Sequence, residues 1–288
     1  MFPGQGSQYI GMGKEFYDAM PEAKAVYDLA NEVTGLDVAA LCFEENDKLN
    51  ITEYTQICML TTEAAIYTAL KAAGIGCDVT AGLSLGEYGA LIASGAMTMR
   101  DAFIGNLCDR MATDDAIFFL AADLGAPALD RIRDQYSERF INVGIAEQNL
   151  INVATGLALE GFNVYTYAIA PFITMRAYEQ ARVNLAISSQ IRPINVTMLG
   201  LGGGVSYVVS GPTHHCLEDL AIMRLLPNMS VYCPSDWIVA TQLVDHTRTT
   251  IGPKYIRFDG KALPAIHADP ASVDLNQGFV QVVSGQEI

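Results

Sequence analysis

The clearest candidate for chemistry is a carboxylate, Glu147, within the run Arg-Phe-Ile-Asn-Val-Gly-Ile-Ala-Glu-Gln-Asn of residues 139–149. It lies just after a strand-like stretch, residues 140–143, and at the start of a helix-like one, residues 147–159. Open α/β sheets place their ligand groups at such strand-to-helix turns. The helix dipole also favours a carboxylate at this position for structural reasons alone, so the run by itself leaves both interpretations open.

Further functional side chains follow other strand-like stretches. Phe172 offers an aromatic face, and stacking on such a face is worth about 0.5–1.5 kcal/mol beyond burial. The adjacent His214 and His215 are of the type that moves protons near neutral pH. Arg257 ends the last strand, where it could clamp a phosphate with two hydrogen bonds, and Asp123 ends the first. The alternatives are a plain core role for Phe172, a structural loop role for His214 and a surface ion pair for Arg257.

A second set of groups centres on Ser84, in the turn Gly-Leu-Ser-Leu-Gly of residues 82–86. The two glycines let the chain turn sharply, which lifts the serine hydroxyl clear of the preceding strand for nucleophilic attack. The run Phe-Pro-Gly-Gln-Gly-Ser-Gln of residues 2–8 lies upstream. Serine without a histidine base is an ordinary alcohol, so the alternative is a serine in a vestigial turn.

Apolar strands alternate with amphipathic helices through the second part of the chain. Strands are expected at residues 116–121, 140–143, 163–168, 193–200, 229–233 and 255–258. Helices are expected at residues 127–138, 147–161, 171–188, 217–225 and 236–248. This alternation predicts an α/β fold with a doubly wound, mostly parallel six-stranded sheet. Upstream, helices at 15–34, 52–73 and 87–94 with one strand at 78–83 predict an incomplete α/β segment.

The composition limits the classes of function. The 288 residues are 51% hydrophobic and 17% charged, which predicts a packed globular core. The net charge of −15 argues against nucleic acid as a partner. No apolar stretch is long enough to span a membrane and the start does not resemble a signal peptide, so we expect a cytoplasmic protein.

The cysteines and two of the histidines carry no motif. The six cysteines, at positions 42, 58, 77, 108, 216 and 233, contain no Cys-x-x-Cys pair. We therefore expect no metal site and interpret them as small buried apolar residues. His246 and His267 are expected to face solvent.

The first hundred residues resemble malonyl-CoA:acyl carrier protein transacylases, through residues 2–8 together with Gly82-Leu-Ser-Leu-Gly-Glu-Tyr88. The resemblance implies that Ser84 is the acyl nucleophile and that the backbone N–H groups of Gln5 and Leu85 form an oxyanion hole. In that family the catalytic histidine and most of the sheet come from residues beyond this point. Different residues stand in their place here.

From about Met99 to Phe258 the sequence resembles the pyrimidine-binding domain of transketolases, which depend on thiamine diphosphate. The resemblance implies that Glu147 hydrogen-bonds and activates the cofactor's aminopyrimidine ring, that Phe172 holds this ring and that Asp123 helps to line the site. It also implies that His214 or His215 acts on the substrate hydroxyls and that Arg257 binds a sugar phosphate. The motifs that carry it, besides the Glu147 run, are Arg100-Asp-Ala-Phe103, Ala122-Asp-Leu-Gly125, Tyr167-Ala-Ile-Ala-Pro-Phe172 with Arg176 and Tyr178, Gly202-Gly-Gly204, Ser210-Gly-Pro-Thr-His-His215 and Tyr255-Ile-Arg257.

Two departures from the transketolase pattern bear on function. Most relatives have aspartate before Gly-Pro-Thr-His, where this chain has Ser210, which leaves the sugar specificity open. The diphosphate and its Mg²⁺ are held in the family by a domain that carries Gly-Asp-Gly, and this chain has none. A diphosphate-binding transketolase subunit is therefore the expected partner, in a homodimer or heterotetramer.

The two resemblances meet at Ala96-Met-Thr-Met-Arg-Asp-Ala-Phe103, which suits both patterns. We hypothesise a chimera or fusion joined at residues 97–103. The expected domains are an acyltransferase-like fragment at 1–98, a transketolase-like pyrimidine domain at 99–265, and a linker with the first strand of a truncated domain at 266–288. The expected activity is ketol transfer between sugar phosphates. The alternatives are malonyl transfer through Ser84 and a fragment that only binds a partner.

Overall fold

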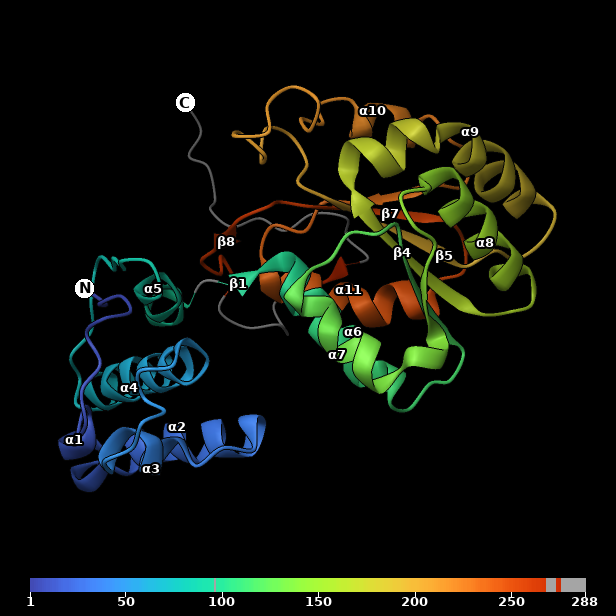
Figure 1. Ribbon diagram of the computed structural model, residues 1–288. Coiled ribbons are helices and arrows are strands. Elements are labelled where there is room, and N and C mark those ends of the chain that lie inside the picture. The colour runs from blue at the N-terminus through green and yellow to red at the C-terminus, as the bar shows by residue number, and fades with distance from the viewer. Residues whose placement is uncertain (96, 268–272, 276–288) are drawn as a thin grey trace, which may run out of the picture. The chain divides into compact units, whose positions relative to one another are not determined.

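The computed structural model describes residues 1–95, 97–267 and 273–275. The chain divides into two compact units, Met1–Ala96 and Met97–Ile288 (Figure 1). The strand expected at 278–284 lies outside the described residues, as does most of the expected linker before it.

The second unit is built on a six-stranded, all-parallel sheet in the order β3-β2-β4-β5-β7-β6. This confirms the six expected strands, and each begins within three residues of its expected start. β5 starts at Val196 rather than at the expected Pro193, and a proline cannot donate a hydrogen bond to a neighbouring strand. The strands are β2 (Ile117–Ala121), β3 (Phe140–Asn142), β4 (Asn163–Ile169), β5 (Val196–Leu201), β6 (Ser230–Tyr232) and β7 (Lys254–Phe258).

Helices cover both faces of this sheet (Figure 1). One face carries α6 (Met99–Met111), η1 (Pro127–Leu129), α7 (Asp130–Gln135) and α11 (Trp237–Thr249). The other carries α8 (Glu147–Leu159), the π-helical segments η3 (Phe172–Arg176) and η4 (Ala181–Ile187), the turn α9 (Tyr178–Gln180) between them, and α10 (Asp219–Arg224). This unit also contains two short 3₁₀ turns, η2 (Ser137–Arg139) and η5 (Ser188–Gln190), and β1 (Met97–Thr98) pairs antiparallel with β8 (Ala262–Leu263).

Alternate residues of the central strands feed two separate cores. On β4, Tyr165 and Tyr167 pack against α6 and α11, whereas Val164 and Ala168 pack against α8 and η4. A strand buried on both faces needs apolar residues in succession rather than in alternation. The near-continuous apolar run of β4 lets this strand pack on both faces of the sheet. This packing fixes the position of the carboxyl end of β4 and of the residues that follow it.

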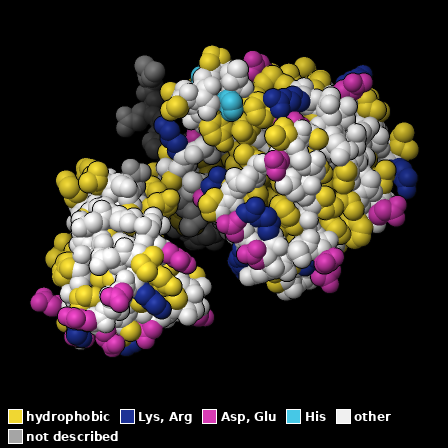
Figure 2. All heavy atoms as spheres, viewed as in Figure 1, with side chains coloured by type: hydrophobic (Ala, Val, Ile, Leu, Met, Phe, Trp, Pro, Cys, Tyr) yellow, Lys and Arg dark blue, Asp and Glu magenta, His cyan; other side chains and the backbone are white. Residues whose placement is uncertain are grey.

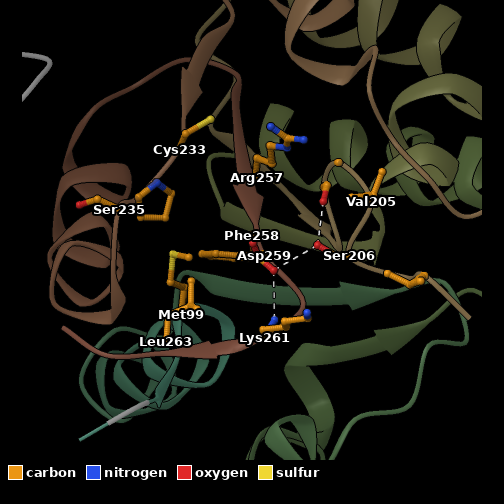
Figure 3. A pocket seen from close by; sticks show the side chains of 14 residues that line it. Met99, Val205, Ser206, Cys233, Ser235, Arg257, Phe258, Asp259, Lys261 and Leu263 are labelled. Atoms are coloured by element: carbon orange, nitrogen blue, oxygen red, sulfur yellow. Dashed lines mark hydrogen bonds between the residues drawn. The ribbon is translucent and has the colours of Figure 1, made fainter. Parts of the chain in front are cut away.

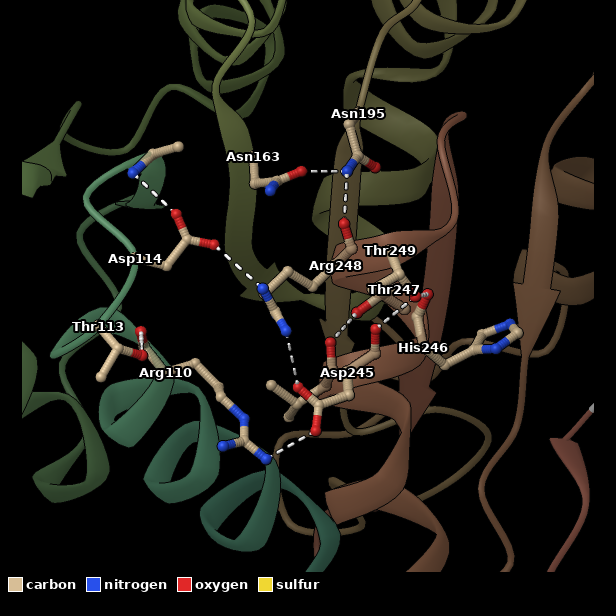
Figure 4. A network of polar contacts seen from close by, with 12 residues as sticks. Arg110, Thr113, Asp114, Asn163, Asn195, Asp245, His246, Thr247, Arg248 and Thr249 are labelled. Carbon is tan, nitrogen blue, oxygen red and sulfur yellow. Dashed lines mark hydrogen bonds and ion pairs between the residues drawn. The ribbon is translucent and has the colours of Figure 1, made fainter.

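Ion pairs join α6 and α11 at the edge where the strands begin (Figure 4). Arg110 Nη2 lies 2.6 Å from Asp245 Oδ2, and Arg248 Nη1 lies 3.3 Å from Asp114 Oδ2. Arg248 also reaches Asp245 at 3.4 Å, so four charges alternate in sign along the two helix ends. A network of several charges contributes more to stability than an isolated ion pair at the surface.

The first unit is helical: α1 (Lys14–Ala19), α2 (Pro21–Thr34), α3 (Val38–Phe43), α4 (Thr52–Ala72) and α5 (Gly86–Ser94). Its core contains Tyr27, Cys42 and Met59. The expected helix at 15–34 is split at Pro21, which begins α2. Proline is tolerated at the first position of a helix but not in its interior.

The expected strand at 78–83 is wrong: its described residues form only an isolated parallel bridge between Phe2 and Gly82. A parallel strand needs hydrogen-bonded neighbours, and the described residues of this unit supply only Phe2 at that position. The α/β character of the chain therefore comes from the second unit.

The expected burial was wrong for two cysteines and for His267. Cys77 and Cys233 are exposed, although the other four cysteines are buried as expected. His267 is 7% exposed rather than solvent-facing, and its Nδ1 lies 2.9 Å from the buried Asp236, the N-cap of α11. Burial opposes ionisation of Asp236, but hydrogen bonds from the Val239 and His267 backbone N–H groups lower its pKa. His246 is partly buried and its Nε2 lies 3.0 Å from the Tyr232 hydroxyl.

Charged side chains of both signs are interspersed over the visible faces of the two units (Figure 2). Of the helices among the described residues, none combines the length and apolar character that crossing a membrane requires.

Glu63 on α4 yields a prediction about stability. Its side chain is 7% exposed, and neither carboxyl oxygen has a hydrogen-bond partner among the described residues. Burial raises its pKa from the ordinary 4.5 to about 7. The folded first unit therefore favours the protonated carboxyl. As a result, the free energy of unfolding of this unit falls as the pH rises from about 4.5 through about 7.

We expect Glu63→Gln to stabilise the first unit at about pH 8 by up to about 3 kcal/mol, and to change it little at about pH 5. Hydrogen exchange of the α4 amides in the full chain measures this. Glu53→Gln, on the exposed first turn of α4, is the matched control. Equal effects of the two substitutions at both pH values would rule out the buried charge as the cause.

Candidate functional site

Glu147 is the first residue of α8 and lies beyond the carboxyl end of β3. Gly144, with φ +75°, turns the chain between the two elements. The Glu147 side chain is 6% exposed, and its Oε1 lies 3.1 Å from Arg176 Nη1. A carboxylate at a helix start is stabilised by the helix dipole. Its burial costs free energy unless a charged partner is present, and Arg176 is that partner.

Arg176 links Glu147 to an aromatic cluster. The Arg176 Cζ lies 3.9 Å from the centroid of the Phe172 ring, within cation–π range. The Phe172 ring also packs edge-on with His214, with the ring centroids 5.3 Å apart and the planes at 63°. Arg176 thus joins Glu147 to Phe172, and Phe172 in turn contacts His214, so three residues expected from separate segments of the sequence form one continuous set of contacts.

Local structure explains why Phe172 and Arg176 act together. Both belong to η3, the π-helical turn that begins directly after Pro171, two residues beyond the end of β4 at Ile169. Residues four apart in a helical turn lie on the same face, and π-helical turns occur often at functional sites. Within the same turn, the Thr174 hydroxyl donates to the Ala170 carbonyl at 2.6 Å.

The loop after β5 positions the histidines. Gly204 and Cys216 exchange backbone hydrogen bonds of 2.7 and 2.8 Å, which closes the loop at its base. Gly202 has φ +70°, and a Cβ there would overlap the Tyr207 ring, so glycine is required. His214 Nδ1 lies 3.0 Å from the Thr213 hydroxyl. His215 Nε2 is buried without a hydrogen-bond partner among the described residues.

Asp123 lies beyond the end of β2, at the same sheet edge. It is exposed and has φ +52°, a conformation that aspartate tolerates better than most residues. Its backbone N–H and its carboxylate each form a 3.1 Å hydrogen bond with the Asn142 side chain. The structure therefore connects Asp123 to the end of β3 rather than to Glu147 itself.

Arg257 lines a separate cavity of about 520 Å³ at the carboxyl ends of β5, β6 and β7 (Figure 3). Ser206, Cys233, Asp259 and Lys261 also line it.

Two of the guanidinium nitrogens of Arg257 contact the protein. Nε lies 3.2 Å from Asp219 Oδ2, and Nη2 donates to the Cys216 carbonyl at 3.3 Å. Asp219 is fully buried and also accepts a hydrogen bond from the Tyr255 hydroxyl at 2.7 Å. The ion pair is thus part-buried rather than the surface pair considered as an alternative.

Arg176 belongs to one of the sequence motifs, but its residue type and position alone predicted no role for it. The signal was its spacing of four residues from Phe172 in a stretch expected to be helical. Asp219 was missed as well, because nothing in the sequence indicates that it lies beside Arg257.

The first unit brings together its own three expected residues. Ser84 is exposed and has φ +55°, an uncommon conformation for serine that fits the sharp turn expected of a nucleophile. Ser84, Gln5 and Leu85 line a cavity of about 510 Å³. Gly86 packs directly against the backbone of residues 2–3, where a Cβ would clash, so the two motifs support one another.

Two family models match the chain. The model of the transketolase pyrimidine-binding domain matches residues 95–264, more than half of the chain. The model of the acyl transferase domain matches residues 1–111. The two matches overlap over residues 95–111, which contain α6, so the chimera-like interpretation fits both findings.

Curated relatives fall into the same two groups. One subunit of the apulose-4-phosphate transketolase of Actinobacillus succinogenes is 39% identical over 49% of this chain and 46% of its own length. The malonyl CoA-acyl carrier protein transacylase of Bacillus subtilis is 40% identical over 52% of this chain and 49% of its own. The chain thus spans about half the length of these relatives. A solved structure of a split-gene transketolase, an inactive beta4 tetramer, is 31% identical with a TM-score of 0.53, over 60% of this chain and 55% of that one.

The contact between Arg257 and Asp219 yields a second prediction. We expect Arg257→Leu to destabilise the second unit by about 3 kcal/mol, because it leaves a buried carboxylate without its cation. Urea unfolding followed by the fluorescence of Trp237, the one tryptophan, measures this. The control is Arg224→Leu at the exposed end of α10, with an expected change within about 0.5 kcal/mol. Equal losses of unfolding free energy from both substitutions would contradict the conclusion that Arg257 stabilises the buried Asp219 carboxylate.

Proposed function

Because residues 95–264 make this chain a member of the transketolase pyrimidine-binding domain family, we propose that it supplies the pyrimidine half of a thiamine diphosphate site. The enzyme would transfer a two-carbon ketol unit between sugar phosphates. The observation that carries the proposal is the convergence of Glu147 and Phe172 on a single flat cationic group, with His214 against the same aromatic ring.

The side chains present fit an aminopyrimidine ring. Such a ring needs a carboxylate at one ring nitrogen and an apolar face against its plane. Glu147 offers the first and Phe172 the second, and both already contact the planar guanidinium of Arg176. When bound, thiamine diphosphate supplies the electron sink that carbon–carbon bond cleavage beside a carbonyl requires.

Each residue then has a role that its chemistry allows. Glu147 holds or shares a proton at the ring nitrogen, and its burial keeps water from competing for that hydrogen bond. Phe172 fixes the plane of the ring. His214, with His215 as the second candidate, moves protons on substrate hydroxyls. Asp123 helps to line the site. Arg257 would bind the sugar phosphate with the N–H groups that Asp219 and Cys216 leave available.

A partner chain would complete the site. The described residues contain no group of three or more histidine, cysteine or acidic side chains that could hold a metal ion. We propose that a diphosphate-binding transketolase subunit, a second type of chain, holds the diphosphate and Mg²⁺ within a heterotetramer. The inactive beta4 tetramer of the split-gene transketolase supports the need for a second type of chain.

Acyl transfer through Ser84 is the second candidate function. The positive φ of Ser84 and the shared cavity with Gln5 and Leu85 favour it. Residues 1–96 contain no histidine, however, so this unit has no residue of the type that activates the serine in the related transacylases.

The ketol transferase proposal predicts that Glu147→Gln weakens thiamine diphosphate binding by about ten- to a hundredfold, the value of one hydrogen bond to a charged group. Calorimetric titration of the chain with thiamine diphosphate and Mg²⁺, with and without a diphosphate-binding transketolase subunit, measures this. Glu138→Gln, at an exposed position before β3, is the control. No binding in either setting would favour an inactive fragment over the proposed enzyme.

Labelled malonyl-CoA separates the two enzyme hypotheses. The ketol transferase proposal predicts no acyl adduct on the intact protein, because Ser84 lacks a base. Mass spectrometry of the chain after incubation, beside the Ser84→Ala variant, detects such an adduct. An adduct that forms on the unsubstituted chain and is absent from Ser84→Ala would favour malonyl transfer.

A further inference from the structure

Arg176 makes both of the contacts that the proposed function assigns to the aminopyrimidine ring. Its Nη1 lies 3.1 Å from Glu147 Oε1, and its Cζ lies 3.9 Å from the centroid of the Phe172 ring. A guanidinium is flat, delocalised and able to stack while it donates hydrogen bonds in its own plane. An aminopyrimidine shares the flat shape, the stacking face and the in-plane donors.

We propose that Arg176 is a displaceable occupant of the aminopyrimidine place, an autoinhibitory contact that the cofactor must replace in order to bind. The inference rests on the proposed function, since it takes Glu147 and Phe172 as the groups that hold the ring. It adds that the affinity of the site is set by competition between a bound ring and the chain's own arginine.

The burial of Glu147 explains why Arg176 occupies this place. A carboxylate on a side chain that is 6% exposed loses most of its hydration, and an unpaired buried charge is strongly unfavourable. Arg176 offsets this loss in the absence of a ligand. A ring that donates to the same carboxylate takes over this role, so the arginine is needed only until the ring is bound.

The exposure of Arg176 allows the exchange. Its side chain is 52% exposed, so the guanidinium already borders water and regains hydration when it leaves Glu147. Phe172, in contrast, is partly buried and its ring also packs against His214, with the centroids 5.3 Å apart. The aromatic platform is therefore held in position while the arginine stacked on it is free to move away.

An opposite role makes the opposite prediction. If Arg176 stayed beside the bound ring as a positioning residue, removing it would weaken binding. If it must leave, removing it strengthens binding and destabilises the ligand-free chain, because Glu147 then has no cation. The combination of tighter binding with lower stability is specific to a displaced occupant.

The test uses the full chain and the hydroxymethyl aminopyrimidine that forms one half of thiamine, a probe that does not need the diphosphate half of the site. We expect Arg176→Met to bind this probe about five- to tenfold tighter than the unsubstituted chain, the combined value of a half-exposed ion pair and a cation–π contact. Binding is followed by NMR titration. Ligand-free Arg176→Met is expected to melt at a lower temperature than the ligand-free unsubstituted chain.

Two further variants support this comparison. Arg182→Met removes a charge from an exposed position in η4 and should change neither affinity nor melting. Arg176→Lys keeps a cation near Glu147 but loses the flat stacking face, so it should fold if Arg176→Met does not, and bind about two- to fivefold tighter than the unsubstituted chain.

Equal or weaker binding by both Arg176 variants would overturn the inference. The proposed function would still stand in that case if the unsubstituted chain bound the probe and Glu147→Gln lost it. Absence of binding by the unsubstituted chain and by every Arg176 variant would overturn the inference and count against the proposed function as well.

Discussion

The buried carboxylate of Glu147 is the constraint on which the site depends. A buried charge is stable only beside a group that replaces its lost interactions with water. The dipole at the start of α8 replaces only part of these interactions. Arg176 supplies the rest, and its stacking on Phe172 extends the contact to His214. A flat, hydrogen-bonding ligand that replaced Arg176 would find a carboxylate and an aromatic face already in position.

The parallel sheet explains why residues distant in sequence meet at this point. Every strand of the six-stranded sheet runs the same way, so the segments after β3, β4 and β5 emerge at one edge. The charged network of Arg110, Asp114, Asp245 and Arg248 ties helix ends at the opposite edge (Figure 4). α6 contributes Arg110 to this network, lies in the overlap of the two family matches and packs within the second unit.

Sequence patterns predicted what depends on local residue types. The six strands are apolar runs between turns, and Glu147, Phe172 and His214 follow strands whose direction a βαβ alternation determines. Contacts that depend on three-dimensional pairing were not predictable. The role of Arg176 depends on how η3 faces α8, and the burial of His267 depends on Asp236, 31 residues away. The expected strand at 78–83 failed for the same reason, because a strand exists only through its neighbours.

The most direct test of the central claim is a crystal structure of the chain with its diphosphate-binding partner and thiamine diphosphate. The account predicts the Glu147 carboxyl within hydrogen-bonding distance of the pyrimidine ring nitrogen, the Phe172 ring against the face of the pyrimidine, and the Arg176 side chain displaced. A bound cofactor whose pyrimidine lies elsewhere, with Glu147 still paired to Arg176, would contradict it.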